Sequence, residues 1–211
     1  MISPEDITQM IIKISMEQKI MEMAKKIGVI RTRDVIAQGI HPEYLRRLCA
    51  KGLLVRTGRG LYVPSNSEVT SHHTLAEASK RVPQGVICLL SALRFHEIGT
   101  QNPHEVWMAL HEKAHRPKCS YPPLHIVRFS DAALTEGIEK HIIEGVPVQV
   151  YCTAKTVADC FKYRNKIGLD VALEALKDCL HRKKATNDDL WNLAKICRVA
   201  SVMKPYMEAL I

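Results

Sequence analysis

The sequence predicts an α+β protein: an N-terminal winged helix-turn-helix followed by a mixed α/β domain with a helical tail. The first observation behind this prediction is the order helix, turn, helix, hairpin over residues 31–63. The second is a later region with strand-like segments in its middle and helical segments at both ends. The third is the length of 211 residues, which is enough for two small domains.

Residues 31–63, RTRDVIAQGIHPEYLRRLCAKGLLVRTGRGLYV, contain start and stop signals for two short helices. Thr32 is a suitable N-cap for a first helix that Gly39 ends. Its apolar pair is Val35 and Ile36. Pro42 at a first helical position starts the second helix. The apolar residues of that helix share one face at i, i+3 and i+4: Leu45, Leu48 and Cys49.

The residues after this helix pair predict a two-stranded hairpin. The apolar segments LLVR and GLYV lie on either side of Thr57-Gly58-Arg59-Gly60, whose glycines suit a tight loop. A helix pair followed by such a hairpin has the order of a winged helix-turn-helix.

Positive charge is concentrated in this stretch, which holds seven Lys and Arg residues against two acids, a net charge of +5. The second helix can pack its apolar face on its own domain and offer the basic face to a DNA major groove. The hairpin tip can reach a minor groove or a phosphate. The candidate DNA-binding residues are Arg31, Arg33, Glu43, Tyr44, Arg46, Arg47, Lys51, Arg56 and Arg59. The alternative is a solvated basic face on a small helical domain.

Composition limits the class of partner. The chain has a net charge of +8 and a pI near 9.2, which suits an anionic partner without choosing among DNA, RNA and a membrane surface. Residues 1–64 have a net charge of +5 and residues 65–211 of +3. Seven singly spaced cysteines predict buried, reduced thiols in a cytoplasmic protein. We expect no signal peptide, no membrane span and no cofactor.

Two further helices are predicted before the helix pair. Ser3 and Pro4, followed by acids, start a helix over residues 4–14. Ser15 begins a second capping-box pattern, so a separate helix is expected from there to Gly28. The helix over residues 4–14 is an extra element, whose apolar stripe packs on the domain core or pairs with a second copy.

The residues Pro64-Ser65-Asn66-Ser67 mark the boundary between a DNA-binding domain, 1–64, and a second domain, 68–211. Helical patterns in the second domain cover residues 74–81, 85–97, 154–166, 171–183, 188–199 and a last piece that ends at Leu210. Strand patterns cover residues 106–110 and 124–129, and a hairpin covers residues 138–143 and 146–151.

One short motif in the second domain suggests metal chemistry. His111-Glu112-Lys113-Ala114-His115 matches HExxH, in which two histidines of one helix bind zinc and the glutamate activates water. The context disagrees, because the strand-like segment VWMAL precedes it and Arg116-Pro117 prevents a long helix. The sequence therefore predicts a polar loop here and no metal site.

The stretch 153–176, TAKTVADCFKYRNKIGLDVALEAL, predicts a helix with a polar face opposite an apolar one. Lys155 and Asp159 are i, i+4 partners on the polar face. That face either packs on a neighbour through salt bridges and hydrogen bonds, or is a functional surface.

Three segments together resemble the AbiEi-type antitoxins of bacterial type IV toxin–antitoxin systems: GRGLYV, LHIVRFSDAALTEGIEKHIIEGVPVQVY and TAKTVADCFKYRNKIGLDVALEALKD. The likeness runs from about Ile20 to Leu210. It implies a bacterial DNA-binding repressor of its own operon, which would also encode a nucleotidyltransferase-like toxin. It further implies that the C-terminal domain supplies the antitoxin activity without a stable complex with the toxin.

The resulting hypothesis is a sequence-specific repressor, not an enzyme, that occludes a promoter. Its partners would be double-stranded operator DNA, with inverted repeats as one form, and the toxin as a genetic partner. The residues assigned to the antitoxin surface are Lys155, Thr156, Asp159, Tyr163 and Arg164. The alternatives are a lone transcriptional regulator without a toxin, a zinc-dependent hydrolase at His111 and His115, and a nuclease in the second domain.

Overall fold

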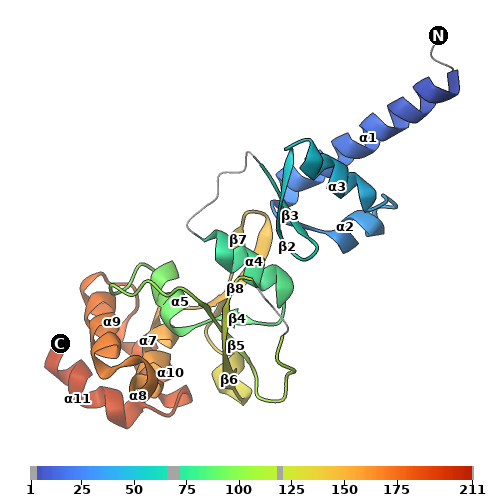
Figure 1. Ribbon diagram of the computed structural model, residues 1–211. Coiled ribbons are helices and arrows are strands. Elements are labelled where there is room, and N and C mark those ends of the chain that lie inside the picture. Colours follow the sequence, from blue (N-terminus) through green and yellow to red (C-terminus); the bar gives the residue numbers. More distant parts are fainter. Residues whose placement is uncertain (1–3, 66–71, 118–120, 211) are drawn as a thin grey trace. The chain divides into compact units, whose positions relative to one another are not determined.

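The structure is a computed structural model that describes residues 4–65, 72–117 and 121–210 (Figure 1). It divides into two compact units, here called unit 1 and unit 2. Unit 1 comprises Met1–Ala76 and Ile142–Val146, and unit 2 comprises Glu77–His141 and Pro147–Ile211. Helices and strands occur in both, so the prediction of an α+β protein is confirmed. Asn66 and Ser67 of the predicted domain boundary lie outside the described residues.

Unit 1 contains a helix pair followed by a hairpin. Its elements are α1 (Pro4–Ile27), β1 (Ile30–Arg31), α2 (Thr32–Ala37), α3 (Glu43–Ala50), β2 (Leu54–Gly58), β3 (Leu61–Pro64) and the first part of α4 (His73–Arg81). The strand β3 is the centre of an antiparallel sheet with the order β1-β3-β2. The predicted helices and hairpin are therefore present, with the short strand β1 in addition.

The predicted break before Ser15 is wrong, because α1 is one continuous helix of 24 residues. Between Pro4 and Ile27 the sequence contains no glycine and no further proline, so nothing in the backbone opposes continuation. The capping-box pattern at Ser15 therefore lies inside a helix. Side chains of α1 are described only from Met16 onward, so the packing of the predicted stripe in residues 4–14 lies outside the described part.

The ends of α2 and α3 follow from local backbone chemistry. Gly39 and Gly52 have φ angles of 71° and 68°, a left-handed conformation that favours glycine, and they end the two helices as predicted. The start of α2 differs from the prediction, because Arg31 rather than Thr32 is the cap residue. The Arg31 amide donates a hydrogen bond to Asp34 Oδ2 at 2.9 Å, so the carboxylate three residues into the helix satisfies the amide of the cap residue.

A small apolar core lies among the three helices and the sheet of unit 1. Its buried members are Ile20, Ala24, Ile30, Val35, Ile40, Leu45, Leu48 and Leu54. The apolar face predicted for α3 is thus present. The prediction for α2 is half wrong, because Ile36 is 54% exposed while Val35 is buried. Neighbouring residues of a helix do not share a face, and only one of the two can reach the core.

Unit 2 is organised around a five-stranded sheet with the order β6-β5-β4-β8-β7. The strands β5 and β6 are parallel, β4 and β8 are parallel, and β4 and β5 are antiparallel. The elements after α4 are β4 (Val86–Ile87), α5 (Leu89–Phe95), β5 (Val106–His111), β6 (Leu124–Phe129), α6 (Asp131–Thr135), β7 (Ile138–Ile143), β8 (Val146–Tyr151), α7 (Thr153–Lys162), α8 (Arg164–Ile167), α9 (Leu169–His181), α10 (Asn187–Ile196) and α11 (Ala200–Leu210).

The predicted strands of this region are confirmed, but two predicted helices divide. The helix predicted over residues 85–97 is the strand β4 followed by α5. Periodicity does not separate a buried strand from a buried helix in a short apolar run, and here pairing with β5 and β8 decides. The helix predicted over residues 154–166 breaks at Tyr163 into α7 and α8.

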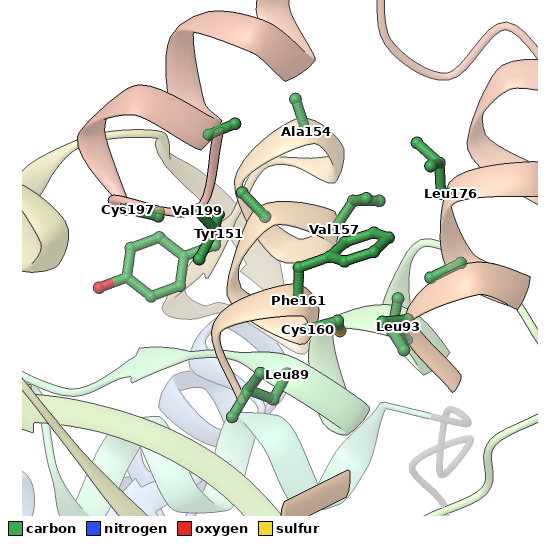
Figure 2. Close-up of a cluster of buried hydrophobic side chains, with 14 of the residues drawn as sticks. Leu89, Leu93, Tyr151, Ala154, Val157, Cys160, Phe161, Leu176, Cys197 and Val199 are labelled. Carbon is green, nitrogen blue, oxygen red and sulfur yellow. The ribbon is translucent and has the colours of Figure 1, made fainter. Parts of the chain in front are cut away.

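The main core of unit 2 surrounds α7. Figure 2 shows Val157, Cys160 and Phe161 of this helix in one cluster with Leu93 of α5 and Leu176 of α9. Every residue of α7 from Thr153 to Phe161 is buried, so this helix is central to unit 2 rather than amphipathic on its surface.

Candidate nucleic-acid interface

The helix α3 has a buried face and a charged face. Leu45 and Leu48 are fully buried, whereas the side chains of Arg46 and Arg47 are 83% and 43% exposed. The apolar spacing in the sequence sets this division, because residues i and i+3 lie together and the residues between them point away. The two guanidinium groups are therefore available to a ligand outside the domain.

Glu43 organises these two arginines. Its Oε1 accepts a hydrogen bond from Arg46 Nη2 at 3.1 Å and lies 3.9 Å from Arg47 Nε. The Arg47 guanidinium also lies over the Tyr44 ring, 5.3 Å from its centroid. The first turn of α3 thus places a carboxylate, an aromatic ring and two guanidinium groups together. These groups can bind base edges and phosphates in a major groove.

Lys51 is 51% exposed and also has a carboxylate partner within unit 1. Its Nζ forms an ion pair with Glu17 Oε2 of α1 at 2.5 Å, and the Glu17 side chain is only 11% exposed. The sequence placed Lys51 on the flank of the basic face, but its charge is already matched inside unit 1. An α1 residue 34 positions away supplied a partner that local pattern did not reveal.

The β2–β3 hairpin carries the remaining basic residues of the predicted wing. Arg56 is exposed, and its Nε donates to Gly58 O at 3.2 Å. Arg59 at the tip is exposed as well. The Thr32 amide donates to Gly60 O at 3.0 Å, which joins the loop of the hairpin to the start of α2.

The two arginines at the start of α2 differ. Arg33 is exposed, with only a 4.0 Å contact between its Nε and Asp34 Oδ1. Arg31 is partly buried and its Nε has no solvent contact. The exposed cations among the predicted residues are Arg33, Arg46, Arg47, Lys51, Arg56 and Arg59. Sequence reasoning missed the role of Glu17 and of Asp34.

The residues assigned to an antitoxin surface are mostly not on a surface. Lys155, Thr156 and Asp159 are fully buried. Lys155 Nζ pairs with Asp159 Oδ2 at 2.5 Å and lies over the rings of Tyr151 and Phe129, at 4.2 and 4.7 Å from their centroids. These contacts support the first interpretation of the helix, in which its polar face packs on neighbours through ion pairs and hydrogen bonds.

Other groups complete this buried polar cluster. Cys197 Sγ donates a hydrogen bond to Asp159 Oδ1 at 3.3 Å, and Thr156 Oγ1 donates to Cys152 O at 2.9 Å. Burial raises the pKa of Asp159, and the Lys155 ammonium only partly offsets this rise. Burial also raises the pKa of the Cys160 and Cys197 thiols, to about 12 for Cys197. These thiols are therefore poor nucleophiles, in agreement with the prediction of buried, reduced cysteines.

Tyr163 and Arg164 are partly buried and also have internal partners. The Tyr163 hydroxyl donates to Arg128 O at 3.3 Å, and Arg164 Nη1 donates to Phe161 O at 2.9 Å. The polar residues of this segment therefore hold α7 and α8 against the rest of unit 2. An exposed surface built from all five predicted residues is excluded.

The HExxH motif does not lie in a helix. His111 is the last residue of β5, and the chain turns directly after it, with the Ala114 amide donating to His111 O at 3.0 Å. Within residues 4–65, 72–117 and 121–210, no group of three or more His, Cys, Asp or Glu side chains is placed to hold a metal ion. The same residues include no helix that is both long and apolar enough to cross a bilayer.

Comparisons with known proteins address unit 1 and the fold. Residues 18–65 match the family described as "Transcriptional regulator, AbiEi antitoxin". The crystal structure of the RV2827C protein from Mycobacterium tuberculosis is similar with a TM-score of 0.62 and 13% identity, over 91% of this chain and 77% of that one. At this identity the likeness concerns the fold alone. No curated protein matches the chain. The predicted resemblance to AbiEi-type antitoxins is therefore confirmed for residues 18–65, the part that holds α2, α3 and the β2–β3 hairpin.

Proposed function

We propose that this protein is a sequence-specific DNA-binding repressor that occludes the promoter of its own operon. The observation that carries the proposal is the pair of exposed guanidinium groups, Arg46 and Arg47, opposite the buried face of α3. That helix lies inside the stretch that matches AbiEi-type transcriptional regulators. A family of regulators agrees with a binding module rather than an enzyme.

In this proposal unit 1 binds as a winged helix-turn-helix. The helix α3 enters a major groove, where Arg46 and Arg47 donate to guanine edges or phosphates and Glu43 accepts from cytosine. Arg56 and Arg59 of the hairpin contact the flanking backbone or the minor groove. Lys51 pairs with Glu17 of α1, and its side chain, 51% exposed, lies on the flank of α3 where it can also approach a phosphate.

The operon would also encode a nucleotidyltransferase-like toxin, whose effect this cytoplasmic protein counteracts in the manner of a type IV system. The match of residues 18–65 to a family described as an antitoxin supports this proposed antitoxin role. A second candidate is a lone regulator without a toxin. The burial of Lys155, Thr156 and Asp159 means that, in either case, these residues do not form a neutralising surface.

Binding to a labelled duplex from the upstream region, measured by fluorescence anisotropy at several salt concentrations, tests the repressor. We expect Arg47→Ala to lower affinity by about 1 to 3 kcal/mol if it reads a base. If it contacts only a phosphate, the slope of log affinity against log salt falls by about one. Lys204→Ala, an exposed lysine of α11 in unit 2, is the charge-matched control and should bind as the parent.

Unchanged affinity for Arg47→Ala at every salt concentration would show that α3 does not face DNA. Co-expression with the neighbouring gene, scored by growth, tests the antitoxin role separately. Rescue by the full chain but not by residues 1–64, in a form that still represses, would assign neutralisation to the second domain. Absence of any toxic neighbour would support the lone regulator.

A further inference from the structure

Lys51 continues the line of basic residues along α3. It is the C-cap residue of this helix and keeps helical dihedral angles, with φ −80° and ψ −1°. Because it follows Arg47 by four residues, both side chains lie on the same side of the helix, one turn apart. The Lys51 side chain is 51% exposed, so an anion outside unit 1 can approach it.

The partner of Lys51 within unit 1 is a nearly buried carboxylate. The Glu17 side chain of α1 is 11% exposed, and its Oε2 lies 2.5 Å from Lys51 Nζ. The other carboxylate oxygen, Oε1, is buried and has no hydrogen-bond partner among the residues that the structure describes. Burial of a carboxylate costs free energy, and an oxygen without a partner increases that cost. Stability alone therefore gives no reason for a glutamate at this position.

A carboxylate lies close to each cation on this side of α3. Glu43 Oε1 contacts the guanidinium groups of Arg46 and Arg47, as Glu17 contacts Lys51. A DNA phosphate that approaches one of these cations must compete with a carboxylate for the same donor. Such competition weakens the attraction to the phosphate backbone, which does not depend on base sequence.

We propose that Glu17 is an internal competitor of the DNA backbone: it holds Lys51 in the free protein, and a phosphate oxygen takes its place when DNA binds. This inference rests on the proposed DNA-binding function and concerns its sequence-independent part. The exchange replaces one charge-assisted hydrogen bond of the ammonium group by another. Lys51 therefore adds little net affinity while Glu17 is charged, and adds more when residue 17 is neutral.

The test uses the full chain and measures fluorescence anisotropy with operator duplex and with random duplex of the same length. Glu17→Gln keeps the side-chain shape and removes the charge. It should raise the affinity for both duplexes by the same factor and steepen the salt slope by about one. The gain should be about 3.5-fold larger at about 50 mM than at about 200 mM salt.

A second substitution shows whether the gain comes through Lys51. Lys51→Gln alone should change the affinity for either duplex less than about twofold, because Glu17 already offsets that charge. In the Glu17→Gln background, Lys51→Gln should remove the whole gain. This dependence of one substitution on the other separates competition from a general effect on the fold. A gain that persists without Lys51 would overturn the proposal.

Glu22→Gln is the matched control, because it removes the same charge from an exposed position of α1. It should change the affinity for either duplex less than about twofold. No gain in Glu17→Gln, with Arg47→Ala still weakened, would refute the competitor and leave the DNA interface standing. Parent-like binding by both variants would refute the interface itself. If circular dichroism shows that Glu17→Gln does not fold, Lys51→Gln decides: a loss as large as that of Arg47→Ala would show that Glu17 does not compete.

Discussion

Asp159→Asn probes the buried charge pair at the centre of unit 2. The substitution keeps the side-chain shape but leaves the Lys155 ammonium without its counter-charge, at a site where both side chains are at most 1% exposed. Removing one partner of a buried ion pair costs about 3 to 5 kcal/mol. The rings of Tyr151 and Phe129 keep some stabilisation of the cation, so we expect the lower end, about 3 kcal/mol.

The assay is urea denaturation followed by far-ultraviolet circular dichroism, with a melting curve beside it. A loss of this size lowers Tm by about 6 to 12 °C in a chain of this length. Glu208→Gln is the matched control, because Lys204 and Glu208 form an i, i+4 pair that is 59% and 65% exposed. That variant should lose less than about 0.5 kcal/mol.

A double variant completes the test. Lys155→Met with Asp159→Leu removes both charges, and replacing a buried pair by apolar residues of similar size is often neutral or stabilising. It should therefore be more stable than Asp159→Asn alone. If Asp159→Asn unfolds at the same urea concentration as Glu208→Gln, the pair contributes nothing through burial and the reasoning is refuted. Loss of neutralisation in Asp159→Asn counts as evidence for function only if the variant remains folded.

Three other outcomes follow from the contacts. Glu43→Gln should raise non-specific DNA affinity and lower discrimination between operator and random duplex in competition anisotropy, because it releases Arg46 and Arg47 from a carboxylate. Arg59→Ala should weaken operator binding with a salt slope lower by about one, and an unchanged slope would remove the wing from the interface. Burial lowers the pKa of His96, whose Nε2 lies 2.7 Å from Tyr151 O. The unfolded chain therefore binds protons first, so stability should fall as the pH drops below about 6.5, and His96→Gln should flatten that dependence in urea titrations.

Local rules determined much of unit 1. Glycine at left-handed positions ended both helices, the spacing of Leu45 and Leu48 defined the buried face of α3, and the hairpin followed from its Gly-rich loop. These features depend on a few neighbouring residues, and so do the strands over residues 124–129 and 146–151. The candidate DNA contacts could be named from sequence for the same reason, since charge and helical phase are both local.

The tertiary structure decided which polar residues are exposed and which short apolar runs pair. Lys51 has its charge matched by Glu17, 34 residues earlier, and no local pattern predicts such a partner. Val86 and Ile87 form a strand because their backbone pairs with β5 on one side and β8 on the other. The helix over residues 153–162 has a polar face and an apolar face, as a surface helix does. Residues packed around it bury both faces, so its Lys–Asp pair lies in the core. Burial depends on what packs around a segment, and that information is distributed over the whole chain.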